Sequence, residues 1–400
     1  MSIFEDFPIK PIINAASAVT RLGGSFMPQQ VLDNFCEAAR YSFEMDQLQA
    51  MASREIAKVT GAEAGLVTAG SASSLTLGSA AIMCGYDLVR MERLPHVDGT
   101  FPDEFVVARE HRNGYDHAVR ASGARLVEVG FQEIVASAGV RRAEPWEYAA
   151  AFGPRTAGVL FGYGDESQRI LPEVVKVAHQ HGVPVLVDAA GRVPPRARLR
   201  SILATGADLV AMSGGKMIRG PQSTGLLFGR RDLIASAALQ MLDMDDHLEL
   251  WDPPPELIDK SKLPGMPRHG IGRAHKVSKE EIVALLTALR LSDSGIYDND
   301  VAPATRMLEK ISHALEGSAC GTKLTPSPDG EVMPSLEIAV DQARLGRSAM
   351  EVCRRLRQGQ PSVHVGQRYL YEGRLMLHPM LIRPDDVDAL IDRLRNELTS

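Results

Sequence analysis

Short apolar runs alternate with amphipathic segments along the chain from Val31 to Leu250. The run AGVLFGY (Ala157 to Tyr163) precedes a helical pattern from Pro172 to His181, and VPVLV (Val183 to Val187) follows that pattern. Uninterrupted apolar strands are typical of sheets covered on both faces, and proline is favoured in the first turn of a helix. The alternation therefore predicts βαβ units, an α/β fold and a mostly parallel sheet.

Two features follow this alternating region. Trp251 to Pro267 is proline-rich and is expected to be a loop or linker, either a flap over the active site or a domain boundary. Ser278 with Glu281 is a capping-box pattern, which predicts that a long helix begins there. The helix would lead into a small domain that ends in the amphipathic segment Pro384 to Leu398. We expect four parts: an N-terminal segment (residues 1–30), a large domain (31–255), a linker with the start of the long helix (256–290) and a small C-terminal domain (291–400).

Composition narrows the classes of function. The chain has 400 residues, 44% hydrophobic and 24% charged, which is enough apolar material for large cores. A net charge of −6 argues against an extended nucleic-acid surface, and the basic stretches at 141–142 and 192–200 are interpreted as solvated. Four scattered cysteines without a CxxC spacing indicate neither a disulfide framework nor a metal site. The start MSIFEDFPIK is unlike a signal peptide and no apolar run reaches membrane-spanning length. We expect a soluble cytoplasmic enzyme with no nucleic-acid or membrane partner.

A lysine on a glycine-rich loop is the first candidate for chemistry. Lys216 follows Ser213, Gly214 and Gly215 at the end of a strand-like run, and a second run, Gly225 to Phe228, begins soon after. A lysine in this position is partly desolvated and can form a Schiff base with a carbonyl cofactor. The alternative is a solvated loop lysine, which is the default for any single lysine.

Two patterns upstream fit the same chemistry. Asp188 ends the VPVLV run, and ligands of open α/β sheets bind outside the carboxyl ends of strands, where this carboxylate could keep a pyridinium nitrogen protonated. Thr68 to Ser73 forms a strand-to-helix turn whose free N–H groups and helix dipole attract a phosphate. The turn has neither the GxxxxGK[ST] nor the GxGxxG pattern, so nucleotide-binding folds lose support. The alternatives are an aspartate that caps the next turn and an ordinary serine N-cap.

The order of these three patterns along the chain matches the large domain of fold-type I pyridoxal-phosphate (PLP) enzymes. More narrowly, the chain resembles the SelA-like branch of that superfamily, which contains L-seryl-tRNA(Sec) selenium transferase and D-glucosaminate-6-phosphate ammonia-lyase. The resemblance covers most of the chain, and SGGK-x-I-x-GPQ is specific for the branch. It rests on these motifs: INAASAVTRLGG (13–24), TGAEAGLVTAGSASS (60–74), REHRNGYDHAVRASGARLVEVG (109–130), VDAAG (187–191), SGGKMIRGPQ (213–222) and GIGRAHKVSKEEI (270–282).

The resemblance implies an aspartate aminotransferase-like large domain with a mostly parallel seven-stranded sheet, a smaller α+β C-terminal domain and a PLP cofactor. It implies that Lys216 carries the Schiff base and that Asp188 pairs with the pyridine nitrogen. Either His111 or Tyr115 would stack on the cofactor ring. We favour His111, because a neutral imidazole can stack and also relay a proton; the alternative is a surface histidine. The phosphate is expected to lie on a further set of residues: Gly70, Ser71, Ala72 and Ser213.

Substrate-binding candidates come from the second half of the chain. A substrate carboxylate needs a cationic fork, for which Arg374 is the first candidate and Arg383 the second. Tyr115 is a third candidate for contact with the substrate. Arg273 and Lys276 are expected to reach a phosphate, across a dimer interface as in many relatives. The alternative for each cation is a merely solvated surface side chain.

The resulting functional prediction is a PLP-dependent lyase that eliminates ammonia or water from a small β-substituted amino acid or amino sugar acid. Lys216 is expected to take the Cα proton while Asp188 keeps the ring cationic. A racemase, aldolase or aminotransferase with the same machinery is the alternative. Only about a dozen residues precede the INAAS motif, which leaves no room for the tRNA-binding domain of selenium transferases, so that activity is disfavoured. We expect a homodimer or higher homo-oligomer that acts on a small amino acid.

Overall fold

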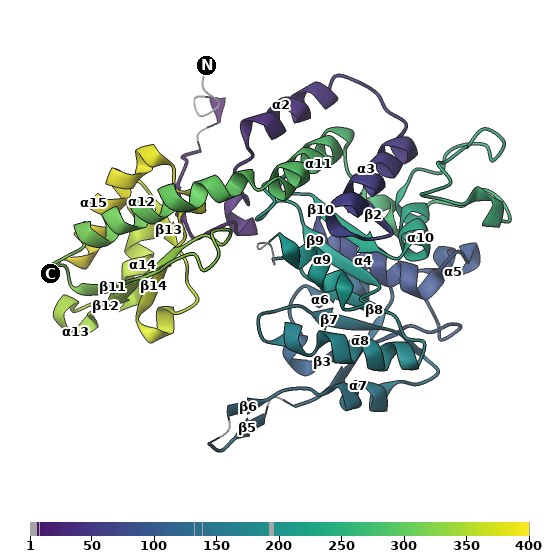
Figure 1. Ribbon diagram of the computed structural model, residues 1–400, viewed down its shortest axis with the longest axis horizontal. Helices are drawn as coiled ribbons and strands as arrows, with labels where there is room; N and C mark the ends of the chain where they lie inside the picture. The colour runs from purple at the N-terminus through teal and green to yellow at the C-terminus, as the bar shows by residue number, and fades with distance from the viewer. Residues whose placement is uncertain (1–5, 8, 132, 138, 192–195, 400) are drawn as a thin grey trace. The chain divides into compact units, whose positions relative to one another are not determined.

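The computed structural model describes residues 6–7, 9–131, 133–137, 139–191 and 196–399 (Figure 1). These residues form two compact units, of which the larger contains residues 27–293 and the smaller combines residues up to 26 with those from 294 onward. Each unit has its own hydrophobic core. No described helix combines the length and the apolar character that crossing a bilayer requires.

The larger unit is built on one seven-stranded sheet. In spatial order its strands are β2 (Ala64–Thr68), β10 (Gly225–Gly229), β9 (Leu209–Ser213), β8 (Val185–Asp188), β7 (Thr156–Gly162), β3 (Glu104–Ala108) and β4 (Arg125–Val129). β10 runs antiparallel to both of its neighbours, and the other pairings described for this sheet are parallel. The predicted α/β fold with a mostly parallel seven-stranded sheet is confirmed.

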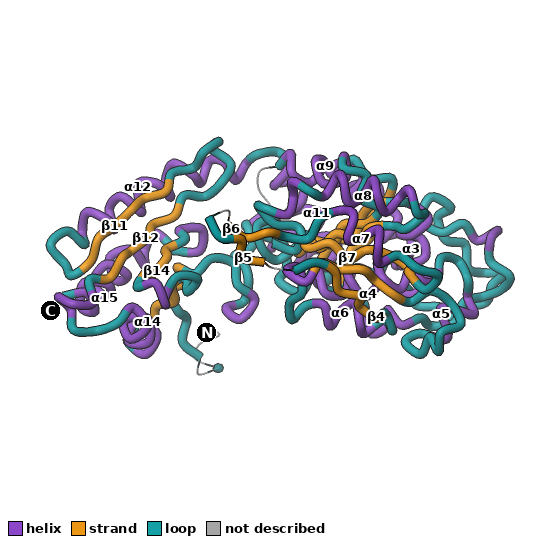
Figure 2. Tube along the Cα trace, turned by 90° about the horizontal axis from the view of Figure 1, so that it is seen from below, coloured by secondary structure: helices purple, strands orange, loops and turns teal. Residues whose placement is uncertain are grey.

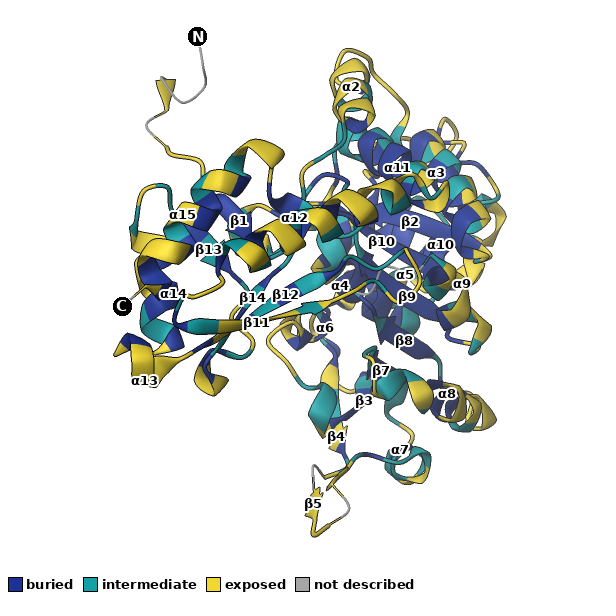
Figure 3. Cartoon of the chain, turned by 60° about the vertical axis from the view of Figure 1, so that its left-hand side comes forward, coloured by how far each residue is buried: buried dark blue, intermediate teal, exposed yellow. Residues whose placement is uncertain are grey.

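Burial on both faces explains why the strands of this sheet are apolar without interruption. Val185 and Val187 of β8 belong to one core and Leu186 belongs to another, and all three side chains are fully buried. Neighbouring residues of a strand point to opposite faces, so a sheet covered on both sides has no polar face. Figure 3 shows these central strands as buried. Each such side chain removed from water stabilises the fold by roughly 1.5–3 kcal/mol.

Helices cover both faces of the sheet (Figure 1). The face that contains Leu186 is covered by α4 (Gly70–Cys84), α5 (Leu88–Arg93), α6 (Asp116–Ala121) and α10 (Arg231–Met241). The face that contains Val185 is covered by α2 (Gln29–Ala38), α3 (Met45–Thr60), α7 (Pro145–Ala151), α8 (Leu171–Gln180), α9 (Ala197–Ala204) and α11 (Lys279–Asp293). A short antiparallel hairpin, β5 (Glu133–Val135) with β6 (Gly139–Arg141), also belongs to this unit.

Local signals in the sequence fix the starts of two of these helices. α8 has Pro172 in its first turn, as predicted. Ser278 precedes α11: its backbone N–H donates to Glu281 Oε2 at 3.2 Å, and the N–H of Glu281 donates to Ser278 Oγ at 3.3 Å. The predicted capping box is therefore confirmed. Trp251 to Pro267 is a loop with one 3₁₀ turn (Lys260–Lys262), and its buried Trp251 anchors it in the core around Leu186.

The smaller unit is an α+β arrangement in which helices flank the strands (Figure 2). Its antiparallel sheet has the order β11 (Cys320–Thr325), β12 (Ser335–Val340) and β14 (Arg374–Leu377), and its helices are α12 (Val301–Ala314), α13 (Gln342–Leu345), α14 (Ala349–Gln358) and α15 (Val387–Leu398). The predicted amphipathic C-terminal segment is confirmed, since α15 buries Val387, Leu390, Ile391, Leu394 and Leu398.

The N-terminal segment belongs to the smaller unit. β1 (Ile13–Ala15) pairs in parallel with β13 (Val363–Val365), and Ile13, Ala15 and Val363 share one core. We expected an N-terminal segment at residues 1–30, and where it packs was not part of that prediction. A three-residue strand is too short to show a period in the sequence, and its partner lies about 350 residues away, so no local pattern indicates this pairing.

Candidate active site

The ends of three strands meet at one edge of the sheet in the larger unit. Gly225, the first residue of β10, pairs with Thr68 at the end of β2 and with Ser213 at the end of β9. Asp188 is the last residue of β8, which is the next strand beside β9. The turn before α4, the turn after Asp188 and the loop with Lys216 therefore all leave the sheet at its carboxyl edge. Open α/β sheets bind their ligands at this edge.

The turn between β2 and α4 offers backbone N–H groups to a ligand. Gly70 begins α4 with a φ of 84°, a backbone conformation that favours glycine. Ala69 occupies the N-cap, and no described side chain caps the N–H groups of the first turn, so the alternative of an ordinary serine N-cap does not hold. Ser71 is half-buried and Ala72 is exposed. An uncapped helix N-terminus carries a partial positive charge and binds anions, phosphate among them.

A glycine in β10 allows the strand to pass very close to this turn. A Cβ built on Gly225 would lie 2.4 Å from the carbonyl carbon of Gly70 and 2.7 Å from the nitrogen of Ser71. The hydroxyl of Ser74 donates to the carbonyl oxygen of Leu226 at 3.1 Å, which ties α4 to the same strand. The position of the uncapped N–H groups is thus set by the packing of the sheet.

Lys216 lies on a loop that is closed by its own backbone. The N–H of Gly214 donates to the carbonyl oxygen of Thr224 at 2.8 Å, and a Cβ on Gly214 would lie 2.3 Å from Thr224 Oγ1. The loop therefore folds this tightly because residue 214 is glycine. The lysine is half-buried, and its Nζ lies 4.0 Å from the position of a Cβ built on Gly191. The amine accordingly faces the turn that follows Asp188.

Asp188 is a half-buried carboxylate, and the amine of Lys216 is the charged group that acts on it. It accepts a hydrogen bond from the backbone N–H of Ala190 at 3.1 Å, which also fits the alternative in which it caps the following turn. Burial raises the pKa of Asp188, while the N–H of Ala190 and the positive charge of Lys216 oppose the rise. A second cation beside this carboxylate, such as a protonated ring nitrogen, would favour its charged form further.

His111 lies over the end of the neighbouring strand β7. It ends a 3₁₀ turn after β3, and a Cβ on Gly162 would lie 3.2 Å from the Cβ of His111. The N–H of Gly162 donates to His111 Nδ1 at 3.3 Å, which leaves the ring proton on Nε2, and burial lowers the pKa of this histidine. Because Gly162 pairs with Asp188, the neutral imidazole lies at the same sheet edge. The side chain of Tyr115 is exposed.

The segment after the proline-rich loop adds a residue that the sequence analysis missed. His275 Nδ1 lies 2.9 Å from Ser73 Oγ on the first turns of α4, and burial lowers the pKa of His275. The guanidinium of Arg273 instead donates to Asp243 at 2.5 Å, and with Lys276 it lines a pocket of about 320 Å³ in the larger unit. The signal for His275 was available, since it lies in the GIGRAHKVSKEEI motif two residues after Arg273.

The two arginines expected to bind a substrate carboxylate belong to the smaller unit. Arg374 donates to Glu337 at 2.6 Å and also bonds to Glu372. Arg383 binds both carboxylate oxygens of Asp386, at 2.7 and 2.9 Å. Both guanidinium groups therefore already have carboxylate partners within their own unit, and a substrate would have to compete with these partners. Their role in substrate binding stays a prediction.

Known proteins are similar to this chain along its whole length. The Aminotransferase class-V family model matches residues 167–243, which include Asp188 and Lys216. A 5'-C-glycyluridine monooxygenase-decarboxylase from Streptomyces sp is 30% identical over 406 residues, covering 99% of this chain and 92% of the relative. A D-glucosaminate-6-phosphate ammonia lyase from Salmonella typhimurium is 26% identical, covering 98% of this chain and 97% of the relative.

Solved structures show the same fold. The structure of a D-glucosaminate-6-phosphate ammonia-lyase matches with a TM-score of 0.80 at 24% identity and covers 100% of this chain and 98% of that one. A Thermus thermophilus aspartate aminotransferase, at 13% identity, matches with a TM-score of 0.50 over 99% of this chain. The chain therefore shares its overall fold with these enzymes.

Proposed function

Because this chain belongs to the SelA-like branch of the fold-type I PLP enzymes, we propose that it is a PLP-dependent lyase acting on a small β-substituted amino acid or amino sugar acid. The observation that carries the proposal is the convergence of three groups at one sheet edge: the uncapped N-terminus of α4, the half-buried carboxylate of Asp188 and the amine of Lys216. Each group alone has an ordinary structural explanation, but their meeting at one edge does not.

The residues at this edge fit the cofactor. The phosphate would bind the free N–H groups at Gly70, Ser71 and Ala72, which no described side chain caps, with Ser213 adding a hydroxyl. Asp188 would hold the pyridine nitrogen in its protonated form, and Lys216 would hold the aldehyde. When bound, the cofactor supplies an electron sink that makes the Cα–H bond of an amino substrate acidic.

Each side chain then has a defined task. The amine of Lys216, in its neutral form, would accept the Cα proton of a bound amino substrate. Asp188 would hold the pyridine nitrogen in its protonated form, because a neighbouring positive charge favours the charged carboxylate and offsets the effect of burial. His111 covers one side of the site as a neutral ring, and its Nε2–H is the group that can donate a proton or a hydrogen bond, since Nδ1 already accepts from Gly162.

The reaction is tested by product analysis. Loss of a β-hydroxyl as water, followed by hydrolysis, converts the substrate into a keto acid and ammonia in equal amounts, with no net change in water. PLP-saturated protein is incubated with D- and L-β-hydroxy amino acids and with amino sugar acids, and both products are measured. Release of ammonia with an equal amount of keto acid is expected. Inversion at Cα without ammonia would replace the lyase with a racemase.

A second candidate comes from the 30% identical relative, which is named a monooxygenase-decarboxylase. The same lysine and aspartate can serve a reaction that breaks the bond between Cα and the carboxylate, with O₂ as the oxidant. The two candidates differ in their products, because the lyase neither consumes O₂ nor releases CO₂. O₂ uptake together with CO₂ release, measured on a panel of amino acids including glycyl nucleosides, would favour the second candidate.

The assembly and location of the enzyme are part of the proposal. We expect a cytoplasmic homodimer or higher homo-oligomer, and the proposed roles of Arg273 and Lys276 toward a phosphate of the partner subunit depend on it. The side chain of Arg273 is partly exposed on the larger unit, which supports contact with a phosphate bound by a partner subunit. Light scattering during gel filtration measures the assembly, and a monomer at micromolar concentration would contradict this part.

A further inference from the structure

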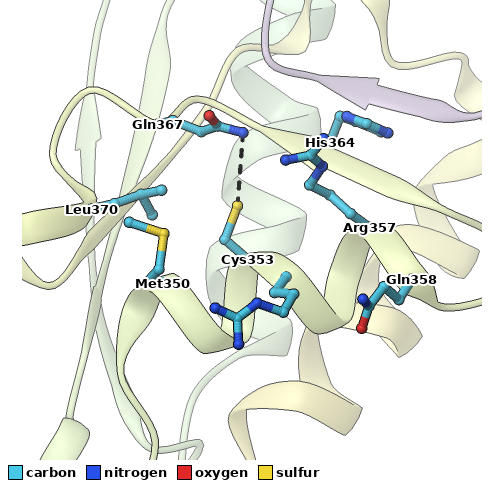
Figure 4. A pocket seen from close by; sticks show the side chains of 8 residues that line it. Met350, Cys353, Arg357, Gln358, His364, Gln367 and Leu370 are labelled. Atoms are coloured by element: carbon cyan, nitrogen blue, oxygen red, sulfur yellow. Dashed lines mark hydrogen bonds between the residues drawn. The ribbon is translucent and has the colours of Figure 1, made fainter.

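The smaller unit contains an arginine-rich groove that the proposed reaction does not use. A pocket of about 560 Å³ lies between α14 and residues 364–370, which belong to β13 and the turn after it (Figure 4). Arg354 and Arg357 line it from the helix, and His364 lines it from β13. Ligand pockets for small molecules have volumes of roughly 300–1,000 Å³, so the space suits a metabolite.

The arginines of α14 fall into two groups. Arg355 points to carboxylates and lies 3.8 Å from both Glu351 and Glu397. Arg354 and Arg357, three residues apart and hence on one helix face, line the pocket instead. Within the part of the chain that the structure describes, neither forms an ion pair with a carboxylate.

A third guanidinium reaches the same groove from the N-terminal segment. Arg21 follows β1, whose parallel pairing with β13 places Asn14 opposite His364. The Nη1 atom of Arg21 lies 3.5 Å from the Nδ1 atom of His364. Arg21 also forms no ion pair with a described carboxylate. Pairing of β1 with β13 therefore brings a cation from the start of the chain next to two from its last quarter.

The positive charge of these arginines affects the pKa values of two titratable groups in the groove. The pKa of His364 is lowered by burial and, in addition, by the charges of Arg357 and Arg21. Burial raises the pKa of the Cys353 thiol, and the same two arginines oppose the rise. Among the residues that the structure describes, no carboxylate contributes to either shift. The chain as a whole carries a net charge of −6, so this positive potential is local to the groove.

We propose that the groove binds the phosphate group of a small phosphate monoester. Guanidinium groups present planar forks of donors that match phosphate oxygens, and charge-assisted hydrogen bonds of this kind are the strongest available to side chains. Gln358 and Gln367 line the groove and add neutral donors. Figure 4 shows Arg357 beside His364 at one end and Met350 with Leu370 at the other. The cationic end suits the phosphate, and the apolar end suits the organic part of the ester.

The groove is tested by calorimetric titration of the full-length, PLP-saturated protein, in which the cofactor's own phosphate site is already filled. Glycerol 3-phosphate and inorganic phosphate are the probes, glycerol is the uncharged control, and ionic strength is held constant. Arg354→Gln and Arg357→Gln are tested singly and together. Arg306→Gln on α12 is the matched control, since Arg306 is an exposed arginine of the same unit outside the groove.

Binding of glycerol 3-phosphate by the wild-type protein is expected, with about a tenfold loss of affinity in each single variant, the effect of one charge-assisted hydrogen bond. The double variant should lose about 100-fold, and Arg306→Gln should bind like the wild type. Tighter binding of the ester than of inorganic phosphate supports a phosphorylated metabolite, and equal binding supports recognition of the phosphate group alone. Unchanged affinity in the double variant, or no binding of either probe by the wild type, overturns the proposal. The absorbance of bound PLP, recorded in parallel, separates this result from a failure of the proposed reaction.

Discussion

Gly225→Ala is expected to weaken PLP binding by displacing the turn before α4. The added Cβ would lie 2.4 Å from the carbonyl carbon of Gly70, and ordinary van der Waals contact begins at 3.4 Å, so the backbone must move by about 1 Å. A shift of that size breaks one or two of the charge-assisted hydrogen bonds that the N–H groups would donate to the phosphate. Each is worth roughly 1.5–3 kcal/mol, so the loss of one bond should raise the Kd for PLP by a factor of about 10 to 150, and the loss of two should raise it further.

The assay is a titration of cofactor-free protein with PLP, followed by absorbance, with thermal unfolding measured alongside. Gly65→Ala is the matched control: its Cβ would lie 2.4 Å from Ile56 Cγ2, which is equally crowded, but Gly65 pairs with Phe228 at the other end of the two strands. Both variants should lose stability, by roughly 1–3 kcal/mol for overpacking. Only Gly225→Ala should lose affinity for PLP. Equal affinities in the two variants would refute the assignment of the phosphate to this turn.

The remaining predictions concern single side chains of the larger unit. Asp188→Asn should retain PLP but lose about 100-fold or more in turnover, because an amide cannot stabilise a buried cation; rates within tenfold of the wild type would remove its proposed role. His275→Ala should weaken PLP binding by about 5- to 10-fold through loss of the bond to Ser73, whereas His313→Ala, an exposed histidine of the smaller unit, should not. Burial lowers the pKa of His111 below its ordinary 6.5, so the unfolded chain binds more protons than the folded one just below that pH. The stability of the cofactor-free protein should therefore fall as the pH drops below about 6.5, and His111→Gln should reduce that fall; a variant with the wild-type slope in thermal unfolding between pH 7 and 5.5 would contradict this.

The sequence predicts the larger unit well because its signals are local. Buried strands such as Val185–Asp188 appear as uninterrupted apolar runs, and the capping box at Ser278 fixes the start of α11 within one residue. The order of the strands in the sheet, by contrast, depends on pairings between distant segments. It was predictable only through the resemblance to a known family.

The candidate site was partly predictable for the same reason. Lys216, Asp188 and the turn at Gly70 each follow a strand, so strand prediction alone places them at the sheet edge. The motif that contains His275 was identified, but the contact that gives this residue its role joins it to Ser73, about 200 residues away, and no local pattern indicates that contact. The ion pair of Arg374 with Glu337 likewise depends on the pairing of two strands, which the sequence pattern does not show. The ion pair of Arg383 with Asp386 is local, but hydrophobic periodicity does not indicate it either.

The central claim is that one particular amine, on the loop after β9, holds the cofactor. Borohydride reduction of the protein incubated with PLP, followed by peptide mass spectrometry, tests it most directly, because reduction makes the bond between the cofactor's aldehyde carbon and the lysine nitrogen permanent. We expect a single phosphopyridoxyl modification at Lys216 and its loss in Lys216→Ala, with Lys176→Ala as an unaffected control on α8. Modification of a different lysine, or the absence of any modification at saturating PLP, would contradict it.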